Sequence, residues 1–386
     1  MNNKNILKTG LSSIAIMSSL VMYPAYAHET ETRHGAASGN GLNAKVEGGM
    51  TATFQASDDN RVDNEGFASF DLVTTIPTRG GEWTIYLEGN TTPGSDHVST
   101  RIGESNGDIG SATDRNGEGR IQVSELHYTT GVGPGSLTVG LVDAGGFLDG
   151  SDVANDETAQ FLGGTFVNNP TIGFPDYTLG FAYHIDNGEK NPSYTFFLGS
   201  SHGLGDNANK SYSQLIDVTK DVDATHEKGV FAAAEVGLPL AGTMVRAGVW
   251  TNTSDQDRND GNGTDENYGL YGVVDGSVGK VKWNMRLGWA NDEVASAESF
   301  IGFAAEMPVA GMTMGAAIGH VVQSDQVSAG AKDDKNHAEI YLKHDYSDNF
   351  SITPSIQFIE NSGFDSSNTT FDDSQTIFSM RANYSF

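Results

Sequence analysis

The chain has 386 residues, of which 22 are basic and 50 are acidic, and its formal net charge is −28 at pH 7. So acidic a chain is repelled by nucleic acid, which excludes a nucleic-acid partner. Cysteine is absent, which excludes disulfides, and the mean hydropathy of −0.35, with no long apolar run after residue 27, excludes a helical membrane protein.

Residues 1–27 predict a secretory signal peptide. Lys4 and Lys8 precede an apolar stretch that is too short to span a membrane as a helix, and Ala25-Tyr26-Ala27 is typical of a cleavage site before His28. We therefore expect the mature chain to leave the cytoplasm, with residues 28–41 as a short N-terminal periplasmic segment and residues 42–386 as one folded unit.

Segments of alternating polarity recur from residue 42 onward. In "KVKWNMRLGWA", Trp283 and Trp289 share one face of an extended strand, while Lys282 and Arg286 share the other. Each segment has the length, about ten residues, that a tilted strand needs to cross a bilayer. Sixteen strands are predicted, over 42–55, 67–76, 81–90, 120–129, 136–143, 176–186, 193–202, 229–238, 242–252, 267–276, 280–290, 297–306, 311–321, 336–346, 349–360 and 373–386.

The connections between these segments fall into two length classes. Short turns at 77–80, 239–241, 277–279, 308–311 and 347–348 alternate with long polar stretches at 91–119, 144–175, 203–228, 253–266, 322–335 and 361–372. A β-sandwich has no reason to sort its loops in this way, whereas outer-membrane barrels do.

The predicted fold is therefore all-β, a closed sixteen-stranded antiparallel transmembrane β-barrel with short periplasmic turns and long extracellular loops. Lipid offers backbone groups no hydrogen-bond partner, so the last strand, "QTIFSMRANYSF", must pair with the first. An even strand number places both termini on the periplasmic side. A barrel of this size encloses a lumen wide enough for water, which makes a pore the default function.

Residues 120–186 carry a more specific resemblance. The strand "SELHY", the strand "LTVGLVD", the loop "ANDETAQFLGGTFVNNP" and the lead-in "FPDYTLG" resemble the carbohydrate-selective outer-membrane porins of the OprB type. "FAAAEVGLPLAGTMVRAGVW", "SITPSIQFIEN" and "TIFSMRANYSF" resemble later strands of that family. The resemblance implies inward loops that form a constriction through which small sugars diffuse in preference to ions.

Stretch 144–175 is the natural candidate for the constriction loop. Aromatic faces and carboxylates suit a sugar, which presents C–H faces and hydroxyls, although the same loop could simply pack on its own phenylalanines. The candidate residues are Asp149, Asp152, Asp156, Glu157 and Phe161, accompanied by Phe147 and Phe166.

Strand alternation predicts the charged and aromatic residues that face the lumen. Arginine is of special interest because its planar set of donors can bind adjacent hydroxyls and repel cations, although inward charges can also pair with one another. Trp83, Trp283 and Trp289 are predicted on the lipid side as girdle residues. The pore-lining candidates are Glu125, His127, Arg246, Trp250, Lys282, Arg286, Glu339, Lys343 and Arg381.

Neither a metal site nor an enzyme is expected. Residues 255–266 resemble a calcium-binding loop, but Asp260 stands where that loop needs glycine, so we expect at most a diffuse interaction with divalent ions. The acidic residues are too numerous to single out a hydrolytic pair, the histidines are not paired at metal-ligand spacing, and no cofactor is expected.

The leading hypothesis is a sugar-preferring porin in the outer membrane of a Gram-negative bacterium. Expected partners are small sugars as permeating solutes, outer-membrane lipid, lipopolysaccharide and the barrel-assembly machinery; association into a homo-oligomer stays open. One alternative is a general diffusion porin with mild cation preference. Another is an adhesion barrel with a plugged lumen.

Overall fold

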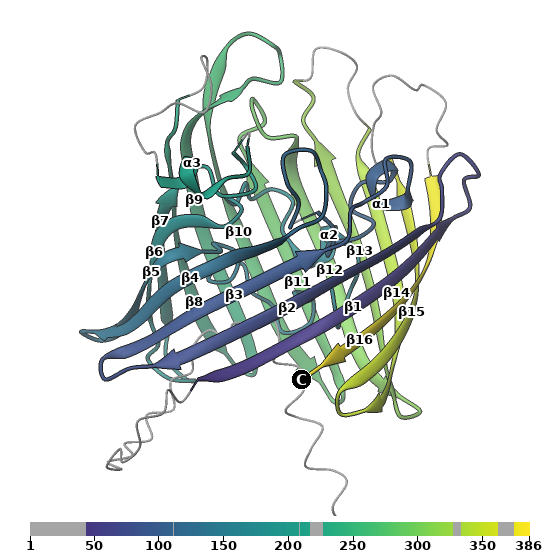
Figure 1. Ribbon diagram of the computed structural model, residues 1–386, viewed down its shortest axis with the longest axis horizontal. Coiled ribbons are helices and arrows are strands. Elements are labelled where there is room, and N and C mark those ends of the chain that lie inside the picture. The colour runs from purple at the N-terminus through teal and green to yellow at the C-terminus, as the bar shows by residue number, and fades with distance from the viewer. Residues whose placement is uncertain (1–43, 111, 208, 217–226, 327–332, 362–373) are drawn as a thin grey trace, which may run out of the picture.

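The alternating segments form sixteen antiparallel strands that close into a barrel (Figure 1). Figure 1 shows a computed structural model, which describes residues 44–110, 112–207, 209–216, 227–326, 333–361 and 374–386. The strands are β1 (Lys45–Ser57), β2 (Glu65–Pro77), β3 (Gly81–Asn90), β4 (Ile121–Val132), β5 (Gly135–Val142), β6 (Thr178–Ile185), β7 (Ser193–Ser200), β8 (Val230–Leu240), β9 (Thr243–Asp257), β10 (Thr264–Val278), β11 (Val281–Ala290), β12 (Ala297–Val309), β13 (Met312–Gln323), β14 (Lys335–Ser347), β15 (Phe350–Glu360) and β16 (Ser374–Ser385).

All sixteen predicted strands are present, and the closed antiparallel barrel is confirmed. The largest difference in a strand bound lies at the end of β9, because its pairing with β10 continues past Asn252 to Asp257, which lies opposite Thr264. That hairpin contains the stretch compared with a calcium loop, residues 255–266, whose two ends, 255–257 and 264–266, are strand.

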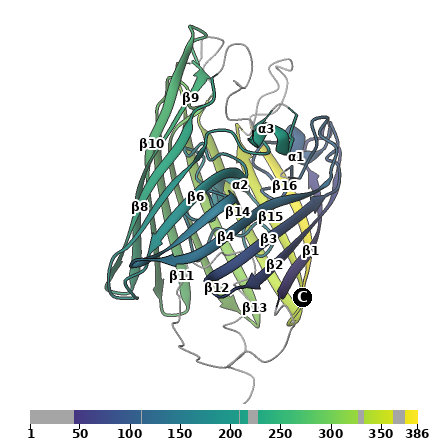
Figure 2. The ribbon, with the colours of Figure 1, turned by 60° about the vertical axis from the view of Figure 1, so that its left-hand side comes forward.

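Connection length alternates as predicted. The turns between β2 and β3, between β8 and β9 and between β12 and β13 are short, while the connections after β3, β5 and β7 are long and carry the short helices α1 (Val98–Arg101), α2 (Gly164–Val167) and α3 (Tyr212–Ile216). Figure 2 shows α1 and α3 at the end of the barrel opposite the C-terminus. The predicted signal peptide and segment 28–41 lie outside the described residues.

The two faces of the strands differ in polarity, as the alternation predicts. Phe54, Ile301 and Phe358 are exposed on the outside, whereas Thr53, Gln357 and Ser379 are buried on the inside. Trp83 and Trp289 are 44% and 37% exposed, and Trp283 stacks on Phe303 of the adjacent strand at 17° between ring planes. Among the described residues no helix is long and apolar enough to span a membrane.

The barrel closes between β1 and β16, with Met50 opposite Tyr384 and Phe54 opposite Met380. Beyond these pairs, the backbone N–H of Phe386 donates to the carbonyl of Gly48 at 2.9 Å, and the N–H of Gly48 donates back at 3.0 Å. The predicted pairing of the last strand with the first is thus confirmed.

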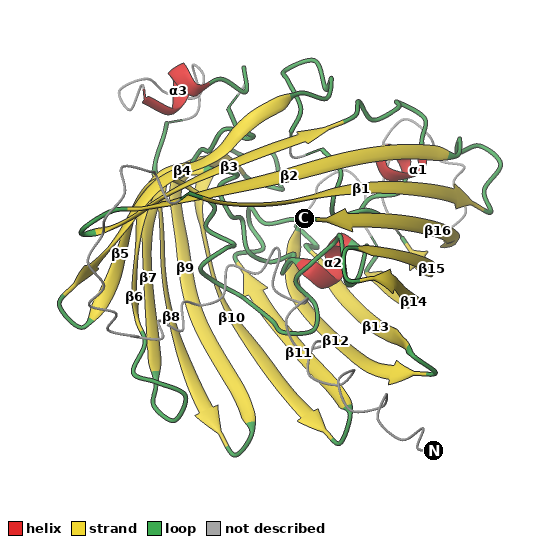
Figure 3. Cartoon of the chain, turned by 60° about the horizontal axis from the view of Figure 1, so that its bottom comes forward, coloured by secondary structure: helices red, strands yellow, loops and turns green. Residues whose placement is uncertain are grey.

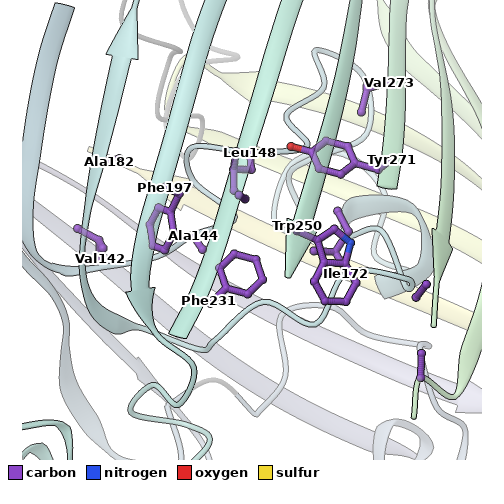
Figure 4. Close-up of a cluster of buried hydrophobic side chains, with 13 residues drawn as sticks. Val142, Ala144, Leu148, Ile172, Ala182, Phe197, Phe231, Trp250, Tyr271 and Val273 are labelled. Carbon is purple, nitrogen blue, oxygen red and sulfur yellow. The ribbon is translucent and has the colours of Figure 1, made fainter. Parts of the chain in front are cut away.

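The apolar core lies inside the barrel, between the inner wall and the loops that enter it. One cluster joins Phe197, Phe231, Trp250 and Tyr271 on the wall to Leu148 of the connection after β5 (Figure 4). A second cluster joins Phe161 and Phe166 of the same connection to Tyr341 on β14. Apolar side chains of the inner wall and of the loop therefore meet in the lumen.

Candidate functional site

The connection between β5 and β6 crosses the lumen. Viewed from the end with the short turns, α2 lies within the ring of strands (Figure 3). This connection contains stretch 144–175, the candidate constriction loop, which we call the inner loop. Its backbone bonds to three inward side chains, Arg286, Glu339 and Arg381, each of them among the pore-lining candidates.

Arg286 on β11 is fully engaged by the inner loop. Its Nη2 donates to the carbonyl of Asp149 at 2.7 Å, its Nη1 donates to the carbonyl of Phe166, and its Nε lies 3.1 Å from the carboxylate of Asp149. Arg286 and Asp149 are 1% and 3% exposed. Loop carbonyls and a carboxylate therefore occupy the donors of Arg286 in this structure.

Arg381 and Glu339 bond the loop in a complementary manner. Arg381 donates to the carbonyl of Gln160 at 2.6 Å and to that of Glu157. Glu339 accepts from the N–H groups of Leu162 and Gly163 at 3.1 and 2.8 Å. Charged hydrogen bonds are stronger than neutral ones, so these two residues act as anchors rather than as free pore charges.

The side chains of three other candidates in the inner loop lie in different environments. Asp156 is buried and accepts from the N–H groups of Thr158 and Ala159, which caps a turn of the loop itself. Asp152 is exposed. Phe161 is fully buried. Its ring centroid lies 5.0 Å from that of Tyr341 and 5.6 Å from that of Phe166. Its ring therefore offers no face to a solute, as the packing alternative anticipated.

A second loop also enters the lumen, which sequence reasoning missed. The carbonyl of Ser105, in the connection after β3, accepts from Gln55 on β1 and Gln357 on β15. The N–H of Gly107 donates to Leu162 at 2.7 Å, and the carbonyl of Glu104 accepts from Gly164 at 2.9 Å. The two loops thus bond to each other inside the barrel and narrow the lumen together.

The wall formed by β2, β3 and β4 carries tyrosines and carboxylates. The hydroxyl of Tyr86 donates to Asp71 at 2.5 Å, and the hydroxyl of Tyr177, just before β6, donates to Glu88 at 2.8 Å. The two rings meet edge to face at 6.4 Å. Asp71, Tyr86 and Tyr177 are each half-buried, so they remain accessible from the lumen. We call Asp71, Tyr86, Glu88 and Tyr177 the tyrosine–carboxylate wall.

Glu125 and His127 lie next to this wall on β4. A β-bulge shifts the register there, so that Ser124 and Glu125 both point inward, and Ser124 donates to Glu88 at 2.7 Å. Glu125 and His127 are 2% and 1% exposed, and their side chains approach to 3.5 Å. Simple alternation predicts the orientation of Glu125 but not that of Ser124.

Trp250 faces inward but is not accessible. It is 3% exposed and stacks on Phe231, with ring centroids 6.1 Å apart and planes at 20°. Figure 4 shows both rings in the cluster that packs the inner loop against β6 to β11. Trp250 therefore supports the loop in this structure.

The remaining candidates lie toward the end with the short turns. Arg246 donates to Asp275 at 2.6 Å, and Lys343 lies 3.8 Å from Asp345. Lys282 is exposed and, with Asp152 and Asp275, lines a cavity of about 500 Å³ there. Among the pore-lining candidates, Arg286, Glu339 and Arg381 thus bond the inner loop, whereas Arg246, Lys282 and Lys343 are charges at one mouth.

Burial changes the acidity of two loop carboxyls near the lumen. Burial raises the pKa of Asp149 to about 6, against the opposing effect of Arg286. Burial likewise raises the pKa of Asp143 to about 6, with Glu88 adding to the rise. Both groups therefore change charge within an experimentally convenient pH range.

In the acidic outer hairpin at 255–266, Arg258 pairs with the surrounding carboxylates. Arg258 lies 2.5 Å from Glu293, 3.3 Å from Asp265 and 3.4 Å from Asp260. Within the described part of the chain, no group of three acidic or histidine side chains is placed to hold a metal ion.

Comparisons with known proteins agree with this architecture. No family model and no curated protein matches the chain. OprB of Pseudomonas putida is similar in structure, with a TM-score of 0.67 at 10% identity, covering 89% of this chain and 94% of that one. The channel DcaP of Acinetobacter baumannii gives 0.54 at 12% identity, covering 91% and 99%, and a loop-deletion mutant of OmpT of Vibrio cholerae gives 0.52 at 13%, covering 89% and 99%. At these identities the similarity shows the fold, which is that of a sixteen-stranded outer-membrane porin.

Proposed function

We propose that the chain is an outer-membrane porin for passive diffusion of small solutes, and that it favours small sugars. The porin fold, the apolar outer face and the polar inner face support the first part. The tyrosine–carboxylate wall supports the second, together with the resemblance of residues 120–186 to carbohydrate-selective porins.

The chemistry of this wall suits a sugar. Ring faces pack against the C–H faces of a pyranose, and carboxylates accept hydrogen bonds from its hydroxyls. Tyr86 and Tyr177 are pinned by Asp71 and Glu88, so the rings are held in place before a solute arrives. Preorganised contacts lose less side-chain entropy on binding, which favours weak but selective recognition.

Solute selectivity tests the sugar preference directly. Swelling of proteoliposomes in glucose should exceed swelling in amino acids of similar size. Replacing Tyr86→Leu should reduce that preference about five-fold, because an aromatic contact contributes about 1 kcal/mol. Trp83→Leu, on the outer face of the same strand, is the matched control and should leave the preference unchanged. Equal swelling rates in both solutes for the unmodified protein would refute the sugar preference.

A general diffusion porin with mild cation preference is the second candidate. The observation that favours it is that Arg286 and Arg381 bond to the inner loop, whereas the carboxylate of the half-buried Asp71 lies on the accessible part of the tyrosine–carboxylate wall. A reversal potential that shows cation preference, combined with equal swelling in sugars and amino acids, would favour this candidate. The absence of any single-channel conductance would instead favour an adhesion barrel whose two loops plug the lumen.

A further inference from the structure

The inner wall contains the same three-residue arrangement twice. On β8, β9 and β10, Glu235 is paired in register with Gly248, and Gly248 with Tyr271. On β12, β13 and β14, Glu306 is paired with Gly315, and Gly315 with Tyr341. We call these the first and second Glu–Gly–Tyr rows, and the second repeats the first four strands further along the barrel.

In each row the tyrosine lies flat across the middle strand. The hydroxyl of Tyr271 donates to Glu235 at 2.8 Å, two strands away, and the hydroxyl of Tyr341 donates to Glu306. A Cβ atom built on Gly248 would overlap the ring of Tyr271, and one built on Gly315 would overlap the ring of Tyr341. Only glycine therefore leaves room for the ring to reach its carboxylate.

Both rows contact the inner loop, at different points. Glu235 accepts from the backbone N–H of Asp149 at 2.9 Å with the same oxygen that binds Tyr271. Tyr341 packs edge to face on Phe161 at 5.0 Å and shares a buried cluster with Val153 and Ala154. Between the rows, β11 contributes Arg286, which bonds Asp149 and Phe166.

We propose that the two Glu–Gly–Tyr rows are positioning elements that hold the inner loop in the lumen. Glu235 and Tyr271 fix its first part, Glu306 and Tyr341 support its middle, and Gly248 and Gly315 make both arrangements sterically feasible. Displacing either tyrosine would break its hydrogen bond to the glutamate of its row and remove a packing surface from the loop. The importance of the rows for solute passage rests on the proposed porin function, but the anchoring itself does not.

Thiol labelling tests the anchoring without any solute. The chain has no cysteine, so Ala154→Cys introduces a single reporter within the inner loop, at a position that is 1% exposed. The labelling rate with a maleimide in detergent is compared between this reporter alone and the reporter combined with Gly315→Ala. Leu148→Cys serves as the reporter for the first row, combined with Gly248→Ala.

We expect each glycine variant to label about ten-fold faster than its reporter alone, since overpacking at a well-packed site favours displacement. Gly272→Ala, on the same barrel wall but with no steric conflict, is the control and should label at the reporter's rate. Tyr341→Phe and Tyr271→Phe keep the ring and remove only the hydroxyl, and should label about five-fold faster.

Heat-modifiable gel migration verifies barrel closure in every variant. If a glycine variant does not fold, the labelling rates of the tyrosine variants decide the outcome. Row variants that label no faster than Gly272→Ala would overturn the proposal. A protein that shows protected reporters but no conductance would refute the porin function while leaving the anchoring intact.

Discussion

The two sides of the lumen use inward residues differently. On β8 to β16, Arg286, Glu339 and Arg381 bond to the inner loop and are almost fully buried. On β2 to β4, Asp71 and Tyr86 are half-buried and bond to each other rather than to that loop. Inward orientation alone therefore does not make a residue part of the path. One side bonds the inner loop, and the other presents half-buried tyrosine and carboxylate side chains.

The largest expected effect comes from removing an anchor. Arg286→Ala leaves Asp149 buried without its ion pair, a change that typically costs about 3–5 kcal/mol. We expect the inner loop to leave its position, with larger and less stable single-channel conductance in planar bilayers. Arg258→Ala, which removes an arginine from the outer hairpin, is the control and should conduct normally. Normal conductance in Arg286→Ala would contradict the anchoring role.

A smaller effect is expected from the opposite wall. Replacing Asp71→Asn and Glu88→Gln together removes two carboxylates without changing their shape, so the loop should stay in place. The ratio of cation to anion permeability, measured as a reversal potential, should fall about two-fold because salt screens lumen charges. Asp345→Asn, at the exposed end of β14, is the matched control. An unchanged reversal potential in the double variant would show that this wall does not line the path.

The smallest expected effect is a pH dependence. The pKa values of Asp143 and Asp149 are raised to about 6, so both carboxyls gain protons as the pH falls through that value. Because protonation removes negative charge from the lumen, cation preference should decrease from about pH 7.5 to about pH 5. Asp143→Asn should show a smaller decrease than the unmodified protein. A cation preference that is constant across this range would argue that neither carboxyl faces the path.

The sequence predicts the barrel well because each strand carries its own signal. Alternation along 281–290 places Trp289 outside and Arg286 inside without reference to any other strand. The length of each connection can likewise be read without reference to any other part of the chain, and it predicts which end of the barrel carries the loops. Trp250 lies four residues after Arg246 and so on the same strand face, which predicts that it points inward, unlike the girdle tryptophans.

The contacts of the inward residues could not be predicted in the same way. Arg286 bonds Phe166 across 120 positions, and Gln357 bonds Ser105 across 252. Such contacts depend on loop conformation, which alternation does not encode. The Glu–Gly–Tyr rows were also missed, because they require the register of three strands. The glycines opposite inward tyrosines become a signal only once that register is known.

The seam between β1 and β16 has a consequence for biogenesis. Asn383 donates to Thr51 across 332 positions, so closure joins two parts of the chain that are separated by almost every other strand. Pairing at such sequence separation is slow, since the chain between must first be organised. Until it occurs, two unpaired edges would be open to other nascent chains. Assembly therefore has to shield both edges up to the final step.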